Sequence, residues 1–176
     1  NNYLSIPDSD PIEFTASQDF AVSFWVKDGG GNANQSSIVE KWSSVSGIGY
    51  PYAFRYHDGS VQFIRYDGTN NPFILGTTRI NDSAWHHIVG VKDGSNLLLY
   101  IDGILADTTV DTTTGITTNT HALYLGTNRQ GEGSYKGNID DLRIFNNALS
   151  AANIASLAAG NDLASSAITP AATLTL

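Results

Sequence analysis

The feature that most constrains this chain is an Asp-Gly dipeptide that recurs between apolar segments. The dipeptide begins at Asp28, Asp58, Asp67, Asp93 and Asp102. Asp-Gly readily adopts the positive φ angles of tight hairpin turns, and it is a strong hairpin signal where alternating apolar residues flank it. Such residues flank most of these dipeptides. The sequence therefore predicts antiparallel strands joined by short turns, with no room for the crossover helices of a parallel sheet.

Further apolar and β-branched runs extend this pattern along most of the chain. We expect strands at residues 3–6, 20–26, 37–40, 52–56, 61–66, 88–91, 97–101, 104–106, 121–125 and 139–145. Many short strands at a spacing near ten residues are typical of a β-sandwich or β-barrel.

The C-terminal part departs from the strand pattern. Residues 150–159 carry Ile154 and Leu157 at helical spacing, with Ser150 as a good N-cap and Gly160 suited to the C-terminal cap. We expect one short helix there. The Ser/Ala/Thr-rich residues that follow have the composition of a linker.

Composition excludes several classes of function. The formal net charge is -8, so the chain repels a phosphate backbone and nucleic acid is not an expected partner. No apolar run approaches the roughly 18 residues of a membrane helix, so we expect no membrane insertion. The absence of cysteine removes disulfides, thiolate metal sites and cysteine nucleophiles.

The order of the motifs resembles a known family. The motifs are DFAVSFWVK at 19–27, IVEK at 38–41, WHHIV at 85–89, LLLYIDG at 97–103, LYLG at 123–126 and GNIDDLRIFNNALS at 137–150. Together they resemble the laminin-G-like, concanavalin A-like lectin/glucanase family, in the form found as modules of bacterial exported proteins. The resemblance implies an all-β, antiparallel two-sheet β-sandwich of jelly-roll type over residues 1–160, with the short helix at its C-terminal end.

Residues 161–176 have no counterpart in the resemblance and are expected to be a linker or a terminal strand. Family members usually begin with one more strand, which this sequence lacks before Asn2. Residues 172–176 alternate like a strand. We hypothesise that they fill the place of that first strand, in the same molecule or in a neighbour.

The carboxylates argue against a glycoside hydrolase. Hydrolases of this fold cluster their catalytic carboxylates on one strand, whereas the only glutamates in the sequence are Glu13, Glu40 and Glu132, all far apart. Asp140 and Asp141 are adjacent, so on a regular strand they face opposite sides. A lyase would need His, Tyr and Arg in one groove, and the strand motifs of such lyases are missing. We expect no enzyme activity.

Two kinds of metal site are conceivable. His86 and His87 are adjacent, face opposite sides of a strand and have no third ligand at a suitable spacing, so zinc is not expected. Calcium is expected from the resemblance, because related jelly rolls often bind a structural calcium through the residue matching Asp140. Asp140 is expected on the same strand face as Leu142 and Ile144, which look core-facing. A carboxylate buried there would need a cation or backbone N–H groups as its partner. Asp19 is the second candidate ligand.

The aromatic residues point to carbohydrate. Trp25 and Trp85 lie in alternating strands, and the resemblance places both in the core. Trp42 instead opens a Ser/Gly-rich loop that ends near Tyr50, and an exposed indole stacks well on a sugar ring. We expect ligand contacts from Trp42 and Tyr50, and from Arg129 and Tyr135 in a second Gly-rich region.

The sequence thus predicts a non-catalytic, lectin-like module that binds a polysaccharide or glycan, with a structural calcium, in a secreted or cell-surface protein. Two alternatives remain open from the sequence alone. One is an adhesion or spacer module that contacts a protein partner or neighbouring modules of the same protein. The other is a polysaccharide hydrolase or lyase domain.

Overall fold

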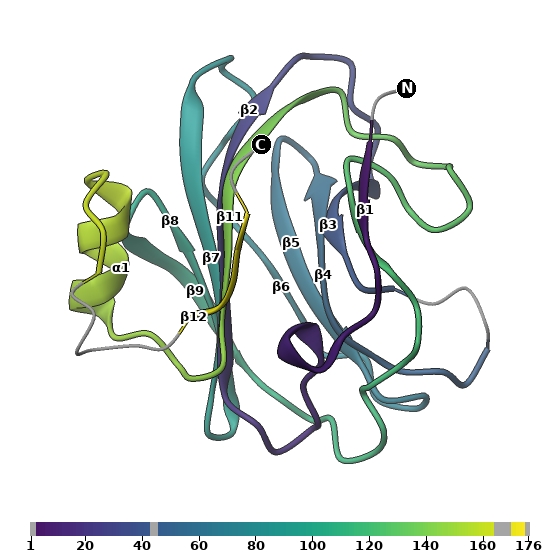
Figure 1. Cartoon of the computed structure of the whole chain (residues 1–176). Coiled ribbons are helices and arrows are strands. Elements are labelled where there is room, and N and C mark those ends of the chain that lie inside the picture. Colours follow the sequence, from purple (N-terminus) through teal and green to yellow (C-terminus); the bar gives the residue numbers. More distant parts are fainter. Residues whose placement is uncertain (1–2, 43–45, 164–169, 175–176) are drawn as a thin grey trace.

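The computed structural model describes residues 3–42, 46–163 and 170–174 and contains two antiparallel six-stranded sheets packed face to face (Figure 1). Sheet A has the strand order β1, β10, β3, β4, β5, β6, and sheet B has the order β12, β11, β2, β7, β8, β9. The predicted all-β sandwich is confirmed.

The strands of sheet A are β1 (Leu4–Ile6), β10 (Leu123–Leu125), β3 (Ser36–Glu40), β4 (Tyr50–His57), β5 (Ser60–Tyr66) and β6 (Phe73–Leu75). Those of sheet B are β12 (Pro170–Leu174), β11 (Gly137–Phe145), β2 (Phe20–Asp28), β7 (Trp85–Asp93), β8 (Asn96–Ile101) and β9 (Ile104–Val110). A 3-10 turn, Asp10–Ile12, follows β1, and the helix α1 (Ala151–Ala158) follows β11. Strand β6 and the 3-10 turn were not expected from the sequence.

The main core lies between the sheets and is rich in aromatic rings. Phe54 and Phe63 of sheet A stack with centroids 4.7 Å apart, and Phe24 of sheet B meets Phe54 edge-on at 5.2 Å. Gly90 of β7 makes this packing possible, because a Cβ there would lie 2.5 Å from the ring of Phe54. All three phenylalanines are fully buried.

The Asp-Gly dipeptides play several roles. Asp58-Gly59 and Asp102-Gly103 have positive φ at both residues and form two-residue hairpin turns, as predicted. The β7–β8 turn is displaced by one residue, because Asp93 already pairs with Asn96. Asp67-Gly68 lies in a longer loop between β5 and β6. Asp28-Gly29 ends β2 before the chain crosses to sheet A, so the hairpin predicted there is wrong.

The helix α1 covers part of the outer face of sheet B (Figure 1). The Ser150 hydroxyl accepts a hydrogen bond from the Asn153 amide, and Gly160 ends the helix with φ +78°. Ile154 and Leu157 are buried against the outward side chains of β2 and β7. The predicted helix is confirmed, with its N-cap and its C-terminal glycine.

The C-terminal strand β12 pairs antiparallel with β11 over Leu142–Phe145 and forms one edge of sheet B. The pairing lies within the same molecule. Residues 175–176 lie outside the described residues, and the equivalence of β12 to the family's first strand stays a prediction.

Two fully buried cations hold loops at the ends of the strands. Lys41 bonds to Asp8 at 2.7 Å, to the Asn119 carbonyl at 3.2 Å and also to Glu13 and the His121 carbonyl. Arg65 pairs with Asp111 and donates to the Pro51 and Thr15 carbonyls. Because each charge is hydrogen-bonded on several sides, its burial is tolerated.

Within the described residues, no helix is long and apolar enough to cross a membrane.

Candidate functional site

The outer face of sheet A carries a row of polar side chains that crosses β3, β4 and β5. Its members are Gln35, Glu40, Arg55, His57 and Gln62, and we call them the polar row. Arg55 and His57 are out of phase with the buried Phe54 on β4, and Gln62 is out of phase with the buried Phe63 on β5, so these three point away from the core. Glu40 is on the same outer face because it pairs with Ala53, the neighbour of Phe54. Successive members are joined by direct hydrogen bonds.

Arg55 is the centre of the polar row. Its Nε donates to Glu40 Oε1 at 2.5 Å, and its Nη1 donates to Gln35 Oε1 at 3.1 Å. Its guanidinium carbon lies 5.5 Å from the ring centroid of Trp42, within the range of a cation–π contact. The guanidinium plane is therefore fixed from three sides.

Gln35 extends the row toward β5 and the β4–β5 turn. Its amide nitrogen donates to Gln62 Oε1 at 3.1 Å and to His57 Nδ1 at 2.9 Å. Gln35 itself has φ +70°, an unusual backbone conformation for a residue other than glycine. The backbone amide of Gln35 bonds to the Tyr56 carbonyl at 2.9 Å, which holds this conformation.

Glu40 gives the row its negative charge. Burial raises the pKa of Glu40, and the neighbouring Arg55 opposes this rise. The side chain is 1% exposed, so it depends on Arg55 for compensation.

Trp42 and Tyr50 flank the row within one small apolar cluster. Trp42 is half-buried, which confirms the expected partial exposure, and it packs against the buried residues Tyr50, Ala53 and Ile64. Tyr50 is only 5% exposed, with its ring 5.7 Å from that of Tyr66. Burial raises the pKa of Tyr50 to about 12. The structure thus brings Trp42 and Tyr50 together, with Trp42 the more accessible.

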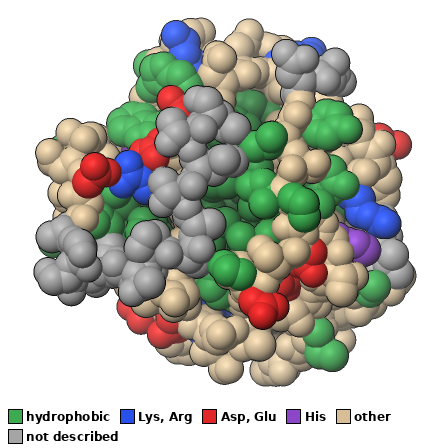
Figure 2. Space-filling model, viewed as in Figure 1, with side chains coloured by type: hydrophobic (Ala, Val, Ile, Leu, Met, Phe, Trp, Pro, Cys, Tyr) green, Lys and Arg blue, Asp and Glu red, His purple; other side chains and the backbone are tan. Residues whose placement is uncertain are grey.

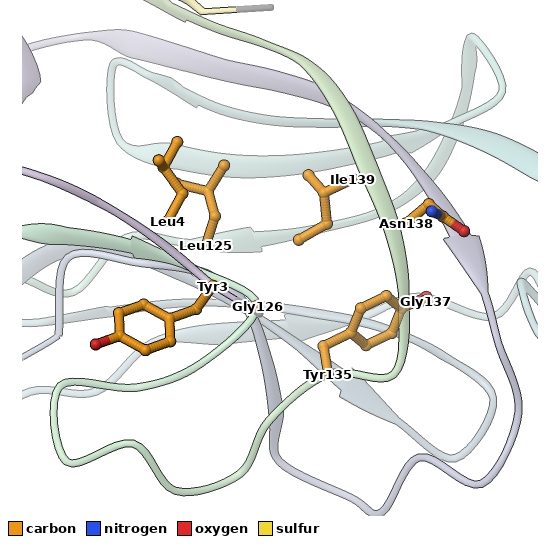
Figure 3. A pocket seen from close by; sticks show the side chains of 8 residues that line it. All are labelled: Tyr3, Leu4, Leu125, Gly126, Tyr135, Gly137, Asn138 and Ile139. Carbon is orange, nitrogen blue, oxygen red and sulfur yellow. The ribbon is translucent and has the colours of Figure 1, made fainter. Parts of the chain in front are cut away.

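Tyr135 lies elsewhere, at the open edge of the sandwich. It lines a pocket of about 400 Å³ with Tyr3, Leu4, Leu125 and Ile139, between β1 and β10 on one side and β11 on the other (Figure 3). Hydrophobic side chains gather between the sheets at this edge in the space-filling view of Figure 2. Tyr135 is itself part of the core cluster.

Arg129 is exposed on the loop between β10 and β11. Neither Arg129 nor Tyr135 contacts the polar row through a hydrogen bond or ring contact among the described residues. The four predicted ligand residues therefore do not form one site.

The two predicted calcium ligands are far apart. Asp19 precedes β2, where its carboxylate accepts from Lys92 at 3.1 Å and from the Gly94 amide at 2.9 Å. Asp140 pairs with Trp25 near the other end of β2, about 20 Å away at the usual rise per residue. The described residues contain no group of three or more His, Asp or Glu side chains that fits a metal ion. Asp19 and Asp140 do not fit one calcium site, and calcium at either residue stays a prediction.

Asp140 also faces the opposite way from the prediction. The pairing of β11 with β2 shifts between Asp140 and Arg143, and Asp141 has φ +49°, so the strand bulges at this point. Leu142 and Ile144 remain buried, whereas Asp140 and Asp141 both line a hollow on the outer face of sheet B. The expectations that Asp140 faces the core and that the two aspartates face opposite sides are wrong.

Trp25 and Trp85 line the same hollow, so their predicted place in the core is also wrong. Trp85 is 42% exposed. The ring of Trp25 lies 5.1 Å from that of His87, its cross-strand partner on β7. The volume of the hollow is about 400 Å³.

The adjacent histidines have separate partners. His86 lies between Asp102 at 2.8 Å and Asp82 at 3.0 Å. Burial acts to lower the pKa of His86, but the hydrogen bonds to the two aspartates outweigh it and raise the pKa. His87 Nε2 lies 2.8 Å from the Ser23 hydroxyl. Burial lowers the pKa of His87 to about 4, so the imidazole is neutral at neutral pH.

A family model described as the concanavalin A-like lectin/glucanases superfamily matches residues 1–155. The chain belongs to this family. Among proteins with curated descriptions, none matches the sequence.

Solved structures with the same concanavalin A-like fold include two toxin domains. The binding domain of Paraclostridial Mosquitocidal Protein 1 is 16% identical, with 89% of this chain and 40% of that chain covered and a TM-score of 0.74. The binding domain of botulinum neurotoxin serotype G is 17% identical, with 89% and 40% covered and a TM-score of 0.71. This chain thus spans about two fifths of each toxin domain.

A third similar structure is domain 4 of AbnA, a GH43 extracellular arabinanase from Geobacillus stearothermophilus, in complex with arabinotriose. It is 22% identical, with 88% of this chain and 72% of that chain covered and a TM-score of 0.63. At these identities the likeness shows the fold. The two toxin domains are described as binding domains, and the AbnA domain is in complex with arabinotriose.

Sequence reasoning missed most of the polar row of this concanavalin A-like domain. One signal was available, because a two-residue turn at Asp58-Gly59 fixes Arg55 opposite Gln62. The contact of Arg55 with Glu40 depends on the β3–β4 register, which has a bulge between Ser37 and Val39 and no turn signal.

Proposed function

We propose that this domain is a non-catalytic carbohydrate-binding module of a secreted or cell-surface protein, and that its glycan site is the polar row with Trp42. The observation that carries the proposal is the fixed position of Arg55, held between Trp42 and its two polar partners on a sheet face that α1 does not cover.

The chemistry of the polar row suits sugar hydroxyls. The exposed amide of Gln35 offers both donors and acceptors, and the half-buried guanidinium of Arg55 offers a planar set of donors. The buried side chains of Glu40 and Gln62 hold these two groups in place. Because these groups already bond to one another, little side-chain entropy is lost when a ligand binds. The half-buried indole of Trp42 supplies an apolar surface for the C–H face of a sugar ring.

A binding role without catalysis is supported by the state of the carboxylates. Glu13 is paired with Lys41, and Glu40 is paired with Arg55. Glu132 lies in an exposed loop. A glycosidase needs an acid and a second carboxylate that act together across the bond to be cleaved. Asp140 and Asp141 share a hollow, but Asp141 is paired with Arg143 at 2.8 Å.

Glycan binding is tested by retention of the purified domain on a glycan array that includes arabinotriose, the ligand of the AbnA domain. We expect retention on at least one neutral glycan, and a loss of about tenfold or more in affinity for Trp42→Ala, because stacking is removed. Trp85→Ala is the matched control, since it removes an exposed tryptophan from the other sheet.

Three results would contradict the proposal. Retention on no glycan would favour the adhesion or spacer module instead. Equal losses for the two tryptophan variants would place the site away from the polar row. A polysaccharide that becomes shorter in the presence of the domain would show an enzyme.

A further inference from the structure

A second ligand site is suggested by the hollow on the outer face of sheet B, which the polar row does not explain. Its lining residues are Trp25, Trp85, Asp140 and Asp141, from β2, β7 and β11. The helix α1 covers the neighbouring part of this face but leaves the hollow open. We name it the Trp-Asp hollow.

The two tryptophans form an apolar surface in the hollow. Trp25 pairs with Asp140 on one side and with His87 on the other, and Trp85 lies two residues from His87 along β7. The contact with the His87 ring holds the indole of Trp25 in place. Trp85 leaves 42% of its surface in water, although covering it would be favourable.

The charge in the hollow is negative and only partly compensated. Asp141 is paired with Arg143, but no cationic side chain pairs with Asp140 in the part of the chain that the structure describes. The Asp140 carboxylate accepts one hydrogen bond, from the Asp141 amide at 2.8 Å. Beside Trp25, His87 is neutral and adds no positive charge, because burial lowers its pKa to about 4.

An uncompensated carboxylate beside two indole rings is the combination that recognises an organic cation. The carboxylates accept hydrogen bonds only, and the indole faces attract an ammonium group. A neutral sugar has no positive charge to pair with Asp140. A bare metal ion has no apolar surface to pack against the indole rings. The hollow is open, and its volume of about 400 Å³ lies within the usual range of small-molecule sites, so it can hold a sugar ring.

We infer that the Trp-Asp hollow binds a protonated amino sugar, with the pyranose against Trp25 and Trp85 and the ammonium group at Asp140. This site is separate from the polar row and takes a different class of sugar. The net charge of -8 draws a cationic glycan toward the domain.

The test compares a glucosamine trimer with its fully N-acetylated counterpart by calorimetry at about pH 6, where amines and carboxylates are both charged. We expect the free amine to bind at least about tenfold more tightly, because acetylation removes the positive charge. Asp140→Asn should abolish that preference, and Trp85→Ala should weaken binding of the trimer about tenfold.

Matched controls separate the two sites. Asp107→Asn makes the same charge change at an exposed position on β9, and Trp42→Ala removes the tryptophan of the polar row. Both should leave glucosamine binding unchanged. Unchanged melting temperatures would show that the variants are folded. If Trp42→Ala loses binding of neutral glycans but keeps binding of glucosamine, the result tests the polar row only. It does not bear on the Trp-Asp hollow.

Several outcomes would overturn the inference. They are equal affinity for the acetylated and free trimers, binding that Trp85→Ala and Asp140→Asn leave intact, and Asp140-dependent binding of calcium without affinity for the amine. A lysine peptide that binds in the hollow while the amino sugar does not would show a protein ligand.

Discussion

The side chains on the outer faces of the two sheets are buried in different ways. Part of the face of sheet B is apolar, with Ala21, Val89 and Val91 buried under α1. The face of sheet A is not covered by α1 and carries the polar row, in which Glu40 and Gln62 are buried by their neighbours. Buried polar groups contribute favourably only while their partners remain. Sheet A should therefore be sensitive to the loss of a single charge, and sheet B to the loss of apolar volume.

The largest expected effect is that of Arg55→Ala on sheet A. It leaves the buried Glu40 carboxylate without its cation, which should cost about 3–5 kcal/mol of the free energy of unfolding, measured with urea. The control on sheet B is Arg143→Ala, whose partners Asp141 and Asp162 are 29% and 89% exposed, and it should cost less than about 1 kcal/mol. Similar losses for the two variants would remove the distinction between the faces.

Removal of apolar volume under α1 should be the next largest effect. Ile154 is fully buried, so Ile154→Ala should cost about 2–5 kcal/mol in the same urea experiment. Ser156→Ala, at a partly exposed position on the same helix, should change stability by about 0.5 kcal/mol or less. A small effect of Ile154→Ala would mean that the helix contributes little to the cover of sheet B.

The stability of the domain should depend on pH through His86 and His87, and the two histidines should act in opposite directions. The pKa of His87 is lowered to about 4, so between the usual value of 6.5 and 4 the unfolded chain binds the proton and stability falls as the pH falls. The pKa of His86 is raised, so its contribution is present at low pH and is lost as the pH rises through its folded value.

Thermal melts at about pH 4.5 and about pH 7.5 measure these contributions. His87→Gln should reduce the loss of stability on acidification, and His86→Gln should increase it. If both variants kept the pH dependence of the parent domain, neither histidine would contribute with the expected sign.

Calcium should have the smallest effect. At about five times its dissociation constant, a bound ion raises stability by about 1 kcal/mol, or about 2–4 °C in Tm for a domain of this size. Because Asp19 and Asp140 lie at different ends of β2, Asp19→Asn and Asp140→Asn should not both remove the shift. A Tm that is unchanged by a chelator would contradict the calcium prediction.

The sequence predicted most of the fold because its signals are local. Alternation indicated the strands, Asp58-Gly59 and Asp102-Gly103 formed true two-residue turns, and Ser150 with Gly160 bounded the helix. The errors on β11 have one cause. A bulge at Asp141 adds a residue without any change in composition, and it reverses which side chains face the core on either side of it.

The candidate sites were less predictable because they join segments that are distant in the sequence. Partial exposure of Trp42 followed from its loop composition, whereas its contact with Arg55 required the register of β3 against β4. The place of Trp25 was wrong for another reason. The core covers one face of β2 and α1 covers part of the other, so this central strand is nearly continuously apolar and alternation does not distinguish the two faces.

The buried ammonium of Lys41 has a consequence for how the domain opens. It binds Asp8 before the 3-10 turn and the carbonyls of Asn119 and His121 before β10. If either segment moved away, the buried ammonium would lose hydrogen-bond partners. These segments, about 110 residues apart in the chain, should exchange their amide hydrogens as one cooperative unit. A loop near the N-terminus and a loop late in the chain would then share a single opening event.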